Sequence, residues 1–238
     1  MMKLLTRRPG EAAATTEDGP DDMFKYALNF NMKTYQIIVR RWGDLNCLPF
    51  IHTFLVWMYY VSFYPSAMGH IEKQFPWTLT AVMLNHIYHT CNFPVRMDSE
   101  VFPGAVKGDS PRPLPEDFKM RGLIYAEDLF PENWYRDARV EEDEKQFELP
   151  SMTDQRKERI LWLGRRIART NKHLTWNEST RQFGVAEAFA AKGEDISLEA
   201  VLSVQKQQEQ GTTSHDSTPD HKLLNQRKVS VQAEDHTP

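Results

Sequence analysis

The stretch CLPFIHTFLVWMYYVSF, residues 47–63, is the most apolar part of the chain and carries no formal charge over 17 residues. A run of this length lies at the short limit for crossing a bilayer, so a buried core helix and a membrane segment are both open. The stretch contains Pro49 and the polar residues His52, Thr53 and Ser62. We therefore expect a core helix and no membrane partner, and a helical protein anchored in a membrane through residues 47–63 is the alternative.

Helical periodicity continues on both sides of this stretch. Upstream, Asp21 and Asp22 precede apolar residues at spacings of three, four and seven, and Gly43 follows them. This pattern predicts a helix that ends at the glycine. The upstream apolar stripe consists of Phe24, Leu28, Tyr35, Ile38 and Trp42. Downstream, Pro76 introduces a predicted helix over residues 77–90, whose stripe consists of Trp77, Ala81, Leu84 and Tyr88.

The second half of the chain contains one long amphipathic segment, residues 153–172. Its predicted apolar face consists of Ile160, Leu163, Gly164, Ile167 and Ala168. Its predicted polar face consists of Arg159, Trp162, Arg165, Arg166, Arg169 and Lys172. Cations next to an aromatic ring are typical of surfaces that bind the phosphates and bases of single-stranded nucleic acid. This face is therefore a candidate nucleic-acid site, and an ordinary solvated helix face is the alternative.

Arg156 differs from the other basic residues of this helix because its helical angle falls close to the apolar stripe. A buried guanidinium requires a carboxylate partner, and we expect Glu116 or Asp117 to provide it. Short helices are predicted near residues 116–129 and 132–138, and another at residues 185–191. The segment HLTWNESTRQFGV, residues 173–185, is expected to be a turn or a brief extended piece. The predicted fold class is therefore all-α.

The composition divides the chain into three parts. Residues 1–20 are interpreted as a flexible leader without the apolar core of a signal peptide. Residues 21–191 form the predicted helical domain. No aromatic residue follows Phe189 over the last 49 positions, so residues 192–238 cannot bury much surface and are predicted to be a disordered tail.

Catalytic and metal-binding patterns are weak. His86 and His89 share a helix face near Cys91, but no fourth metal ligand is evident. The carboxylates of residues 141–144 are consecutive, whereas metal-dependent nucleases need carboxylates that converge from separate elements. Nucleophile-elbow, P-loop and dinucleotide-binding motifs are missing. We therefore predict a non-enzymatic protein with no metal and no cofactor, and two cysteines that indicate a reducing compartment, nucleus or cytoplasm.

Two strings, RPLPEDFKMRGL (residues 112–123) and ELPSMTDQRKERILWLGRRIA (residues 148–168), resemble the helical domain of the Est/SMG family. This family comprises telomerase-associated Est proteins and SMG proteins of nonsense-mediated mRNA decay. The first string matches its Leu-Pro-Glu-Asp…Arg-Gly element through Leu114, Pro115, Glu116, Asp117, Arg121 and Gly122. The second matches its Arg-x-x-Arg-x-Leu-x-Leu-Gly helix through Arg156, Arg159, Leu161, Leu163 and Gly164.

This resemblance covers roughly residues 21–189 and implies a fold of helical hairpins packed as an α-solenoid-like array. It matches the part that follows the TPR-containing region of the family, so we expect a fragment, a truncated gene model or a short paralogue of fungal type. We expect the family's phosphopeptide pocket to lie upstream of this match, and we expect no counterpart of its PIN nuclease domain. The resemblance implies an adaptor for single-stranded RNA, telomeric DNA, or telomerase and decay proteins, in which the first string and Arg156 have an architectural role.

Overall fold

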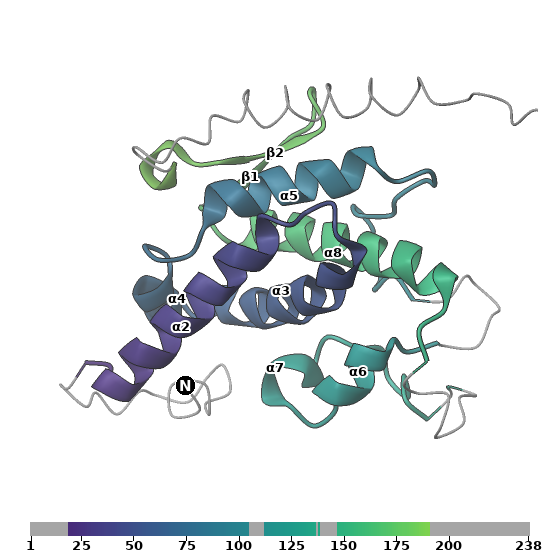
Figure 1. Ribbon diagram of the computed structural model, residues 1–238, viewed down its shortest axis with the longest axis horizontal. Coiled ribbons are helices and arrows are strands. Elements are labelled where there is room, and N and C mark those ends of the chain that lie inside the picture. The colour runs from purple at the N-terminus through teal and green to yellow at the C-terminus, as the bar shows by residue number, and fades with distance from the viewer. Residues whose placement is uncertain (1–18, 105–111, 137, 139–146, 191–238) are drawn as a thin grey trace, which may run out of the picture. The chain divides into compact units, whose positions relative to one another are not determined.

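The computed structural model describes residues 19–104, 112–136, 138 and 147–190 (Figure 1). The predicted leader, the acidic run of residues 141–144 and the predicted tail lie outside the described residues, apart from residues 19 and 20. The described residues belong to one unit that ends at Glu194. They are mostly helical, as predicted.

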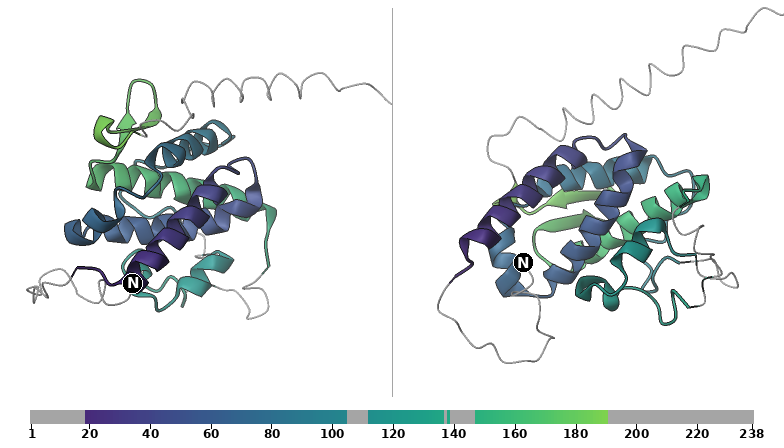
Figure 2. Two further views of the ribbon diagram at one scale, coloured as in Figure 1. Left: turned by 60° about the vertical axis from the view of Figure 1, so that its left-hand side comes forward. Right: turned by 60° about the horizontal axis from the view of Figure 1, so that its bottom comes forward.

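Helix α3, Leu48–Ser62, is the central element of this unit. Ile51, Leu55 and Met58 on this helix are completely or almost completely buried. Helix α8, Pro150–Thr170, packs along α3, and α7, Ile124–Glu127, contacts it from another side (Figures 1 and 2). The predicted core helix is thus confirmed, and no helix in the described part of the chain is long and apolar enough to cross a membrane.

Four further helical elements lie between residues 22 and 89. They are α2 at Asp22–Val39, the 3-10 turn η1 at Leu45–Cys47, α4 at Pro65–Ile71 and α5 at Trp77–His89. Asp21 caps α2 as expected, because its Oδ1 accepts a 2.7 Å hydrogen bond from the Phe24 amide. The helix ends at Val39 and not at Gly43, since the amides of Arg41 and Asp44 bond carbonyls three residues back in tight turns. Ile38 and Trp42 of the predicted stripe are only partly buried.

The predicted helical region at residues 116–129 consists of two short helices, α6 at Pro115–Met120 and α7. The Asp117 carboxylate accepts a 2.8 Å hydrogen bond from the Leu114 amide at the start of α6. Gly122 follows α6 with a φ of 79°, a left-handed conformation that favours glycine. The predicted helix at residues 132–138 is wrong for residues 132–136, which form turns, and residue 137 is not described.

The described residues are mostly helical but include a small sheet: residues 173–185, predicted to be a turn or a brief extended piece, form a β-hairpin. Strands β1, Leu174–Asn177, and β2, Gln182–Val185, pair antiparallel with Leu174 opposite Val185. Asn85 of α5 fixes β2 by bonding both the amide of Phe183 at 2.7 Å and its carbonyl at 2.9 Å. The helix predicted at residues 185–191 is a 3-10 turn, η3 at Glu187–Phe189, because Val185 belongs to the strand.

Candidate functional site

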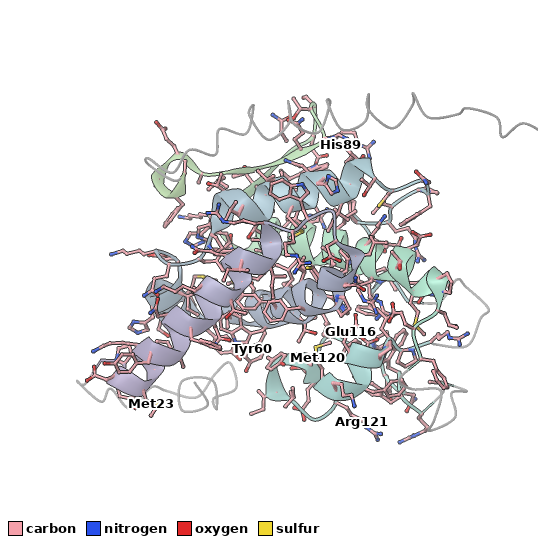
Figure 3. All side chains as sticks on the ribbon, in the orientation of Figure 1. Met23, Tyr60, His89, Glu116, Met120 and Arg121 are labelled. Atoms are coloured by element: carbon pink, nitrogen blue, oxygen red, sulfur yellow. The ribbon has the colours of Figure 1, made fainter. Side chains whose placement is uncertain are left out.

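The first candidate cluster is a buried ionic network between α6 and α8. Glu116 of α6 points toward α3 (Figure 3) and accepts two hydrogen bonds from Arg156, Nε–Oε1 at 2.5 Å and Nη2–Oε2 at 2.9 Å. His52 Nδ1 of α3 lies 3.0 Å from the same Oε1 atom. Glu148 bonds Arg156 from the other side at 2.7 Å. The predicted pairing of Arg156 with Glu116 is therefore confirmed.

A second ion pair lies next to the first and joins Asp117 of the first motif, residues 112–123, to Arg159 of the second, residues 148–168. Arg159 Nη1 lies 2.6 Å from Asp117 Oδ2, and both side chains are almost completely inaccessible to solvent. The Arg159 guanidinium also stacks on the rings of Phe102 and Trp134, at 5.0 and 5.2 Å. Arg159 was predicted to face solvent on the nucleic-acid surface, and its burial corrects that prediction.

Burial alone raises the pKa of Glu116, but the hydrogen bonds and charges of His52 and Arg156 outweigh it, so this pKa lies well below its usual range. Burial alone lowers the pKa of Arg156, but the hydrogen bonds and charges of Glu116 and Glu148 outweigh it and raise this pKa above its ordinary value. The Glu116–Arg156 pair thus stays charged. The arrangement fits a structural joint between α3, α6 and α8 and offers no open group to a substrate.

The candidate nucleic-acid face of α8 lies partly under the connector of residues 92–104. Trp162 is 5% exposed, and its Nε1 donates a 2.8 Å hydrogen bond to the Ser99 carbonyl. Its predicted place on a solvent-facing surface is therefore wrong. The Arg166 guanidinium lies over one face of the Trp162 ring, 4.9 Å from the ring centre. A nucleic-acid base therefore cannot stack on that face.

The remaining arginines of that face are engaged by carboxylates. Arg165 binds Asp98 at 2.7 Å and also Glu178. Arg166 and Arg169 bind the two carboxylate oxygens of Glu100 at 2.5 and 2.8 Å. Lys172 is exposed. The structure thus brings the predicted cations together, but three acids neutralise the three arginines. The sequence signal that could have predicted this neutralisation is the pair of acids Asp98 and Glu100 in the connector.

Arg121 and Gly122 of the first motif lie away from the network. Figure 3 shows Arg121 at the far side of α6 from Glu116, where its guanidinium lies 5.5 Å from the centre of the Tyr135 ring. It pairs with neither acid of the motif. The same figure places His89 at the end of α5, and the described residues contain no group of three side chains that could hold a metal.

A further candidate site was not predicted: the outer face of α2. Four apolar side chains on this face are largely exposed, with exposed fractions between 65% and 76%. They are Met23, Tyr26, Phe30 and Ile37, here called the α2 outer stripe. Figure 3 shows Met23 at the first turn of α2, with its side chain directed away from α3. These four residues are spaced by three, four and seven positions, which is a helical pattern visible in the sequence. The core was assigned from the sequence to the apolar stripe on the opposite side of the helix, so this second stripe was not identified as a site.

Comparison with known proteins gives no match: no protein-family model, no curated protein and no solved structure matches this chain.

Proposed function

We propose that this chain is a non-catalytic helical adaptor that binds a protein partner through the α2 outer stripe. The observation that carries the proposal is that α2 has two opposed apolar faces. Phe24, Leu28, Met32, Tyr35 and Val39 are buried on one face, and the outer stripe is exposed on the other. An ordinary surface helix has a single apolar face, so a second one supports an additional packing partner.

The exposed stripe extends over almost the whole length of α2. Met23 and Ile37 lie 14 positions apart, which corresponds to about 21 Å along a helix. Contiguous exposed apolar surface of this kind is typical of protein interaction sites. The stripe also fits the array of helical hairpins implied by the Est/SMG resemblance, since each hairpin in such an array packs on the next.

The place of the adaptor in telomere maintenance or nonsense-mediated mRNA decay rests on the resemblance, as does its nuclear or cytoplasmic location. One spatial relationship supports the architectural role that the resemblance implies for the two motifs. The motif acids Glu116 and Asp117 pair with Arg156 and Arg159 of the second motif. The two strings that carry the resemblance therefore act as one structural unit, which is the architectural role expected for them.

Direct binding of single-stranded RNA or telomeric DNA is the second candidate function. It is favoured by the concentration of Arg165, Arg166 and Arg169 on the last turns of α8, next to the exposed Lys172. The carboxylates of Asp98, Glu100 and Glu178 oppose it, because a phosphate would have to displace them. The geometry therefore supports a protein partner better than a nucleic acid.

The test compares the tagged wild-type chain with Phe30→Glu in affinity capture from nuclear and cytoplasmic extracts. Phe63→Glu is the matched control, because Phe63 is also exposed, at 53%, but lies just past the end of α3. We expect telomerase or decay proteins with the wild type and with the control, and their loss with Phe30→Glu.

Titration of the same proteins with single-stranded RNA and G-rich DNA over a salt series tests the second candidate. Steep salt dependence that disappears when Arg165, Arg166 and Arg169 are changed to Glu would establish direct binding to phosphates. Unchanged capture by Phe30→Glu together with that result would reject the protein-adaptor proposal.

A further inference from the structure

Three of the four side chains of the α2 outer stripe are evenly spaced about Phe30, while Tyr26 has Thr34 at the matching position on the other side. Met23 lies seven residues before Phe30 and Ile37 seven residues after it, so each is about two helical turns away on the same face. All three side chains are at least 65% exposed. A stripe with this spacing matches itself when a second copy of the helix runs in the opposite direction. Phe30 then meets the partner's Phe30, and Met23 lies level with the partner's Ile37.

The charges at the two ends of α2 fit the same arrangement. Asp22 begins the helix and Arg40 follows its last residue. On a helical wheel the two residues fall at the same angle, on one flank of the stripe. In the antiparallel pair Asp22 and the partner's Arg40 differ by about 3 Å in height along the axis. A parallel pair would instead place Asp22 and the partner's Asp22 at the same height but on opposite flanks of the stripe, without an opposite charge beside either. The end charges therefore favour the antiparallel direction.

From the repeat about Phe30 and these end charges we propose that a second copy of this chain occupies the outer stripe, in an antiparallel α2–α2 pair on a two-fold axis at Phe30. The inference rests on the proposed function, because it names the partner of the same surface. Isologous contacts of this kind are the usual basis of homodimers. One helix face is smaller than the surface of about 800 Å² that each partner buries in an interface of standard size. We therefore expect concentration-dependent dimers.

Sedimentation velocity of the full chain from about 1 to 200 μM tests the association. We expect the wild type and Phe63→Glu to shift from monomer to dimer within this range, and Phe30→Glu to weaken dimerisation at least about tenfold, because two carboxylates would meet on the axis. A wild type that stays monomeric, or a dimer unaffected by Phe30→Glu, would overturn the proposal.

Disulfide trapping tests the direction of the helices, with the wild-type chain, which contains Cys47 and Cys91, as the baseline. Phe30→Cys should cross-link to itself under mild oxidation. Ile37→Cys alone should not, because the two sulfurs would be about 21 Å apart along the axis. A mixture of Met23→Cys and Ile37→Cys should form the mixed dimer. Self-linking of Ile37→Cys would indicate a parallel pair and would overturn the antiparallel arrangement.

Failure of this inference and failure of the proposed function give different results. A monomeric wild type whose telomerase or decay partners are still lost in Phe30→Glu leaves the adaptor proposal intact and assigns the stripe to a different protein. A monomeric wild type whose capture is the same in Phe30→Glu and Phe63→Glu rejects both.

Discussion

Arg156 and Glu116, 40 positions apart in the chain, form a two-point ion pair in the interior, with distances of 2.5 and 2.9 Å. The Arg156 side chain is 2% exposed and that of Glu116 is 9% exposed. His52 lies 3.0 Å from the same carboxylate. One acid of the short helix α6 thus connects α3 and α8.

Arg156→Ala should lower the free energy of unfolding by about 3–5 kcal/mol, because it leaves the buried Glu116 charge without its main partner. Urea unfolding followed by circular dichroism measures the change. Arg169→Ala is the control, since Arg169 is 36% exposed and its ion pairs lie at the surface, where such pairs contribute at most about 1 kcal/mol. Equal stability of Arg156→Ala and the wild type would contradict a structural role for the pair.

The depressed pKa of Glu116 predicts a loss of stability in acid. Its carboxylate is ionised more readily in the folded chain than in the unfolded chain, so the stabilisation is complete above the unfolded pKa of about 4.3. It decreases as the pH falls from about 5 toward the folded pKa, because the folded state must then take up a proton against its own preference.

Glu116→Gln isolates this contribution, since the amide resembles the protonated acid. We expect the variant to be less stable than the wild type at pH 7, and the difference to shrink steadily between about pH 5 and pH 3. Urea midpoints measured at each pH for both proteins provide the test. A difference that does not change with pH would show that the charge of Glu116 is not the cause.

The sequence predicted a buried Arg156 paired with an acid of residues 116 and 117, because the signal on α8 is local. Arg156 falls at the angle of the apolar stripe on α8, and a guanidinium there needs an acid. The same wheel placed Arg159 and Trp162 toward solvent, which the structure corrects. A helical wheel describes one helix alone, whereas the connector of residues 92–104 covers this side of α8 and receives both side chains.

The β-hairpin could not be identified from period alone, because each strand has only four residues. The contacts that fix it come from α5, about 98 positions away in the case of Asn85 and Phe183. The residues of the α2 outer stripe have a helical spacing in the sequence. The sequence alone does not show which of the two apolar faces of α2 packs into the core and which is exposed. Only the packing of α2 against α3 and α5 settles that choice.

Gly164 of α8 lies against the side chain of Leu84 on α5. A Cβ atom added at this position would lie 2.8 Å from Leu84 Cδ1 and 3.0 Å from Cδ2, and Leu84 is completely buried. Gly164→Ala should therefore lower the free energy of unfolding by about 1–3 kcal/mol. The double variant Gly164→Ala/Leu84→Ala should lose less than the sum of the two single variants, by roughly 1 kcal/mol. Strict additivity in a double-mutant cycle would refute the contact.

The neutralised arginines of α8 lead to a prediction of gained binding. Asp98→Asn, Glu100→Gln and Glu178→Gln together remove the acids that hold Arg165, Arg166 and Arg169. The freed guanidinium groups should then bind phosphates, so we expect affinity for single-stranded RNA to rise about tenfold or more at low salt. The log–log salt slope should steepen by about 0.7 for each new phosphate contact.

A variant with the same charge change at a different place separates local release from net charge. Glu127→Gln, Asp128→Asn and Glu132→Gln change exposed acids around α7, away from the α8 arginines. This control should gain little affinity, because it frees no arginine of α8. Fluorescence anisotropy with one RNA oligonucleotide in a salt series measures all three proteins. If both triple variants gain equally, the acids act only through overall charge, and the ion pairs of Asp98, Glu100 and Glu178 do not mask a phosphate-binding surface.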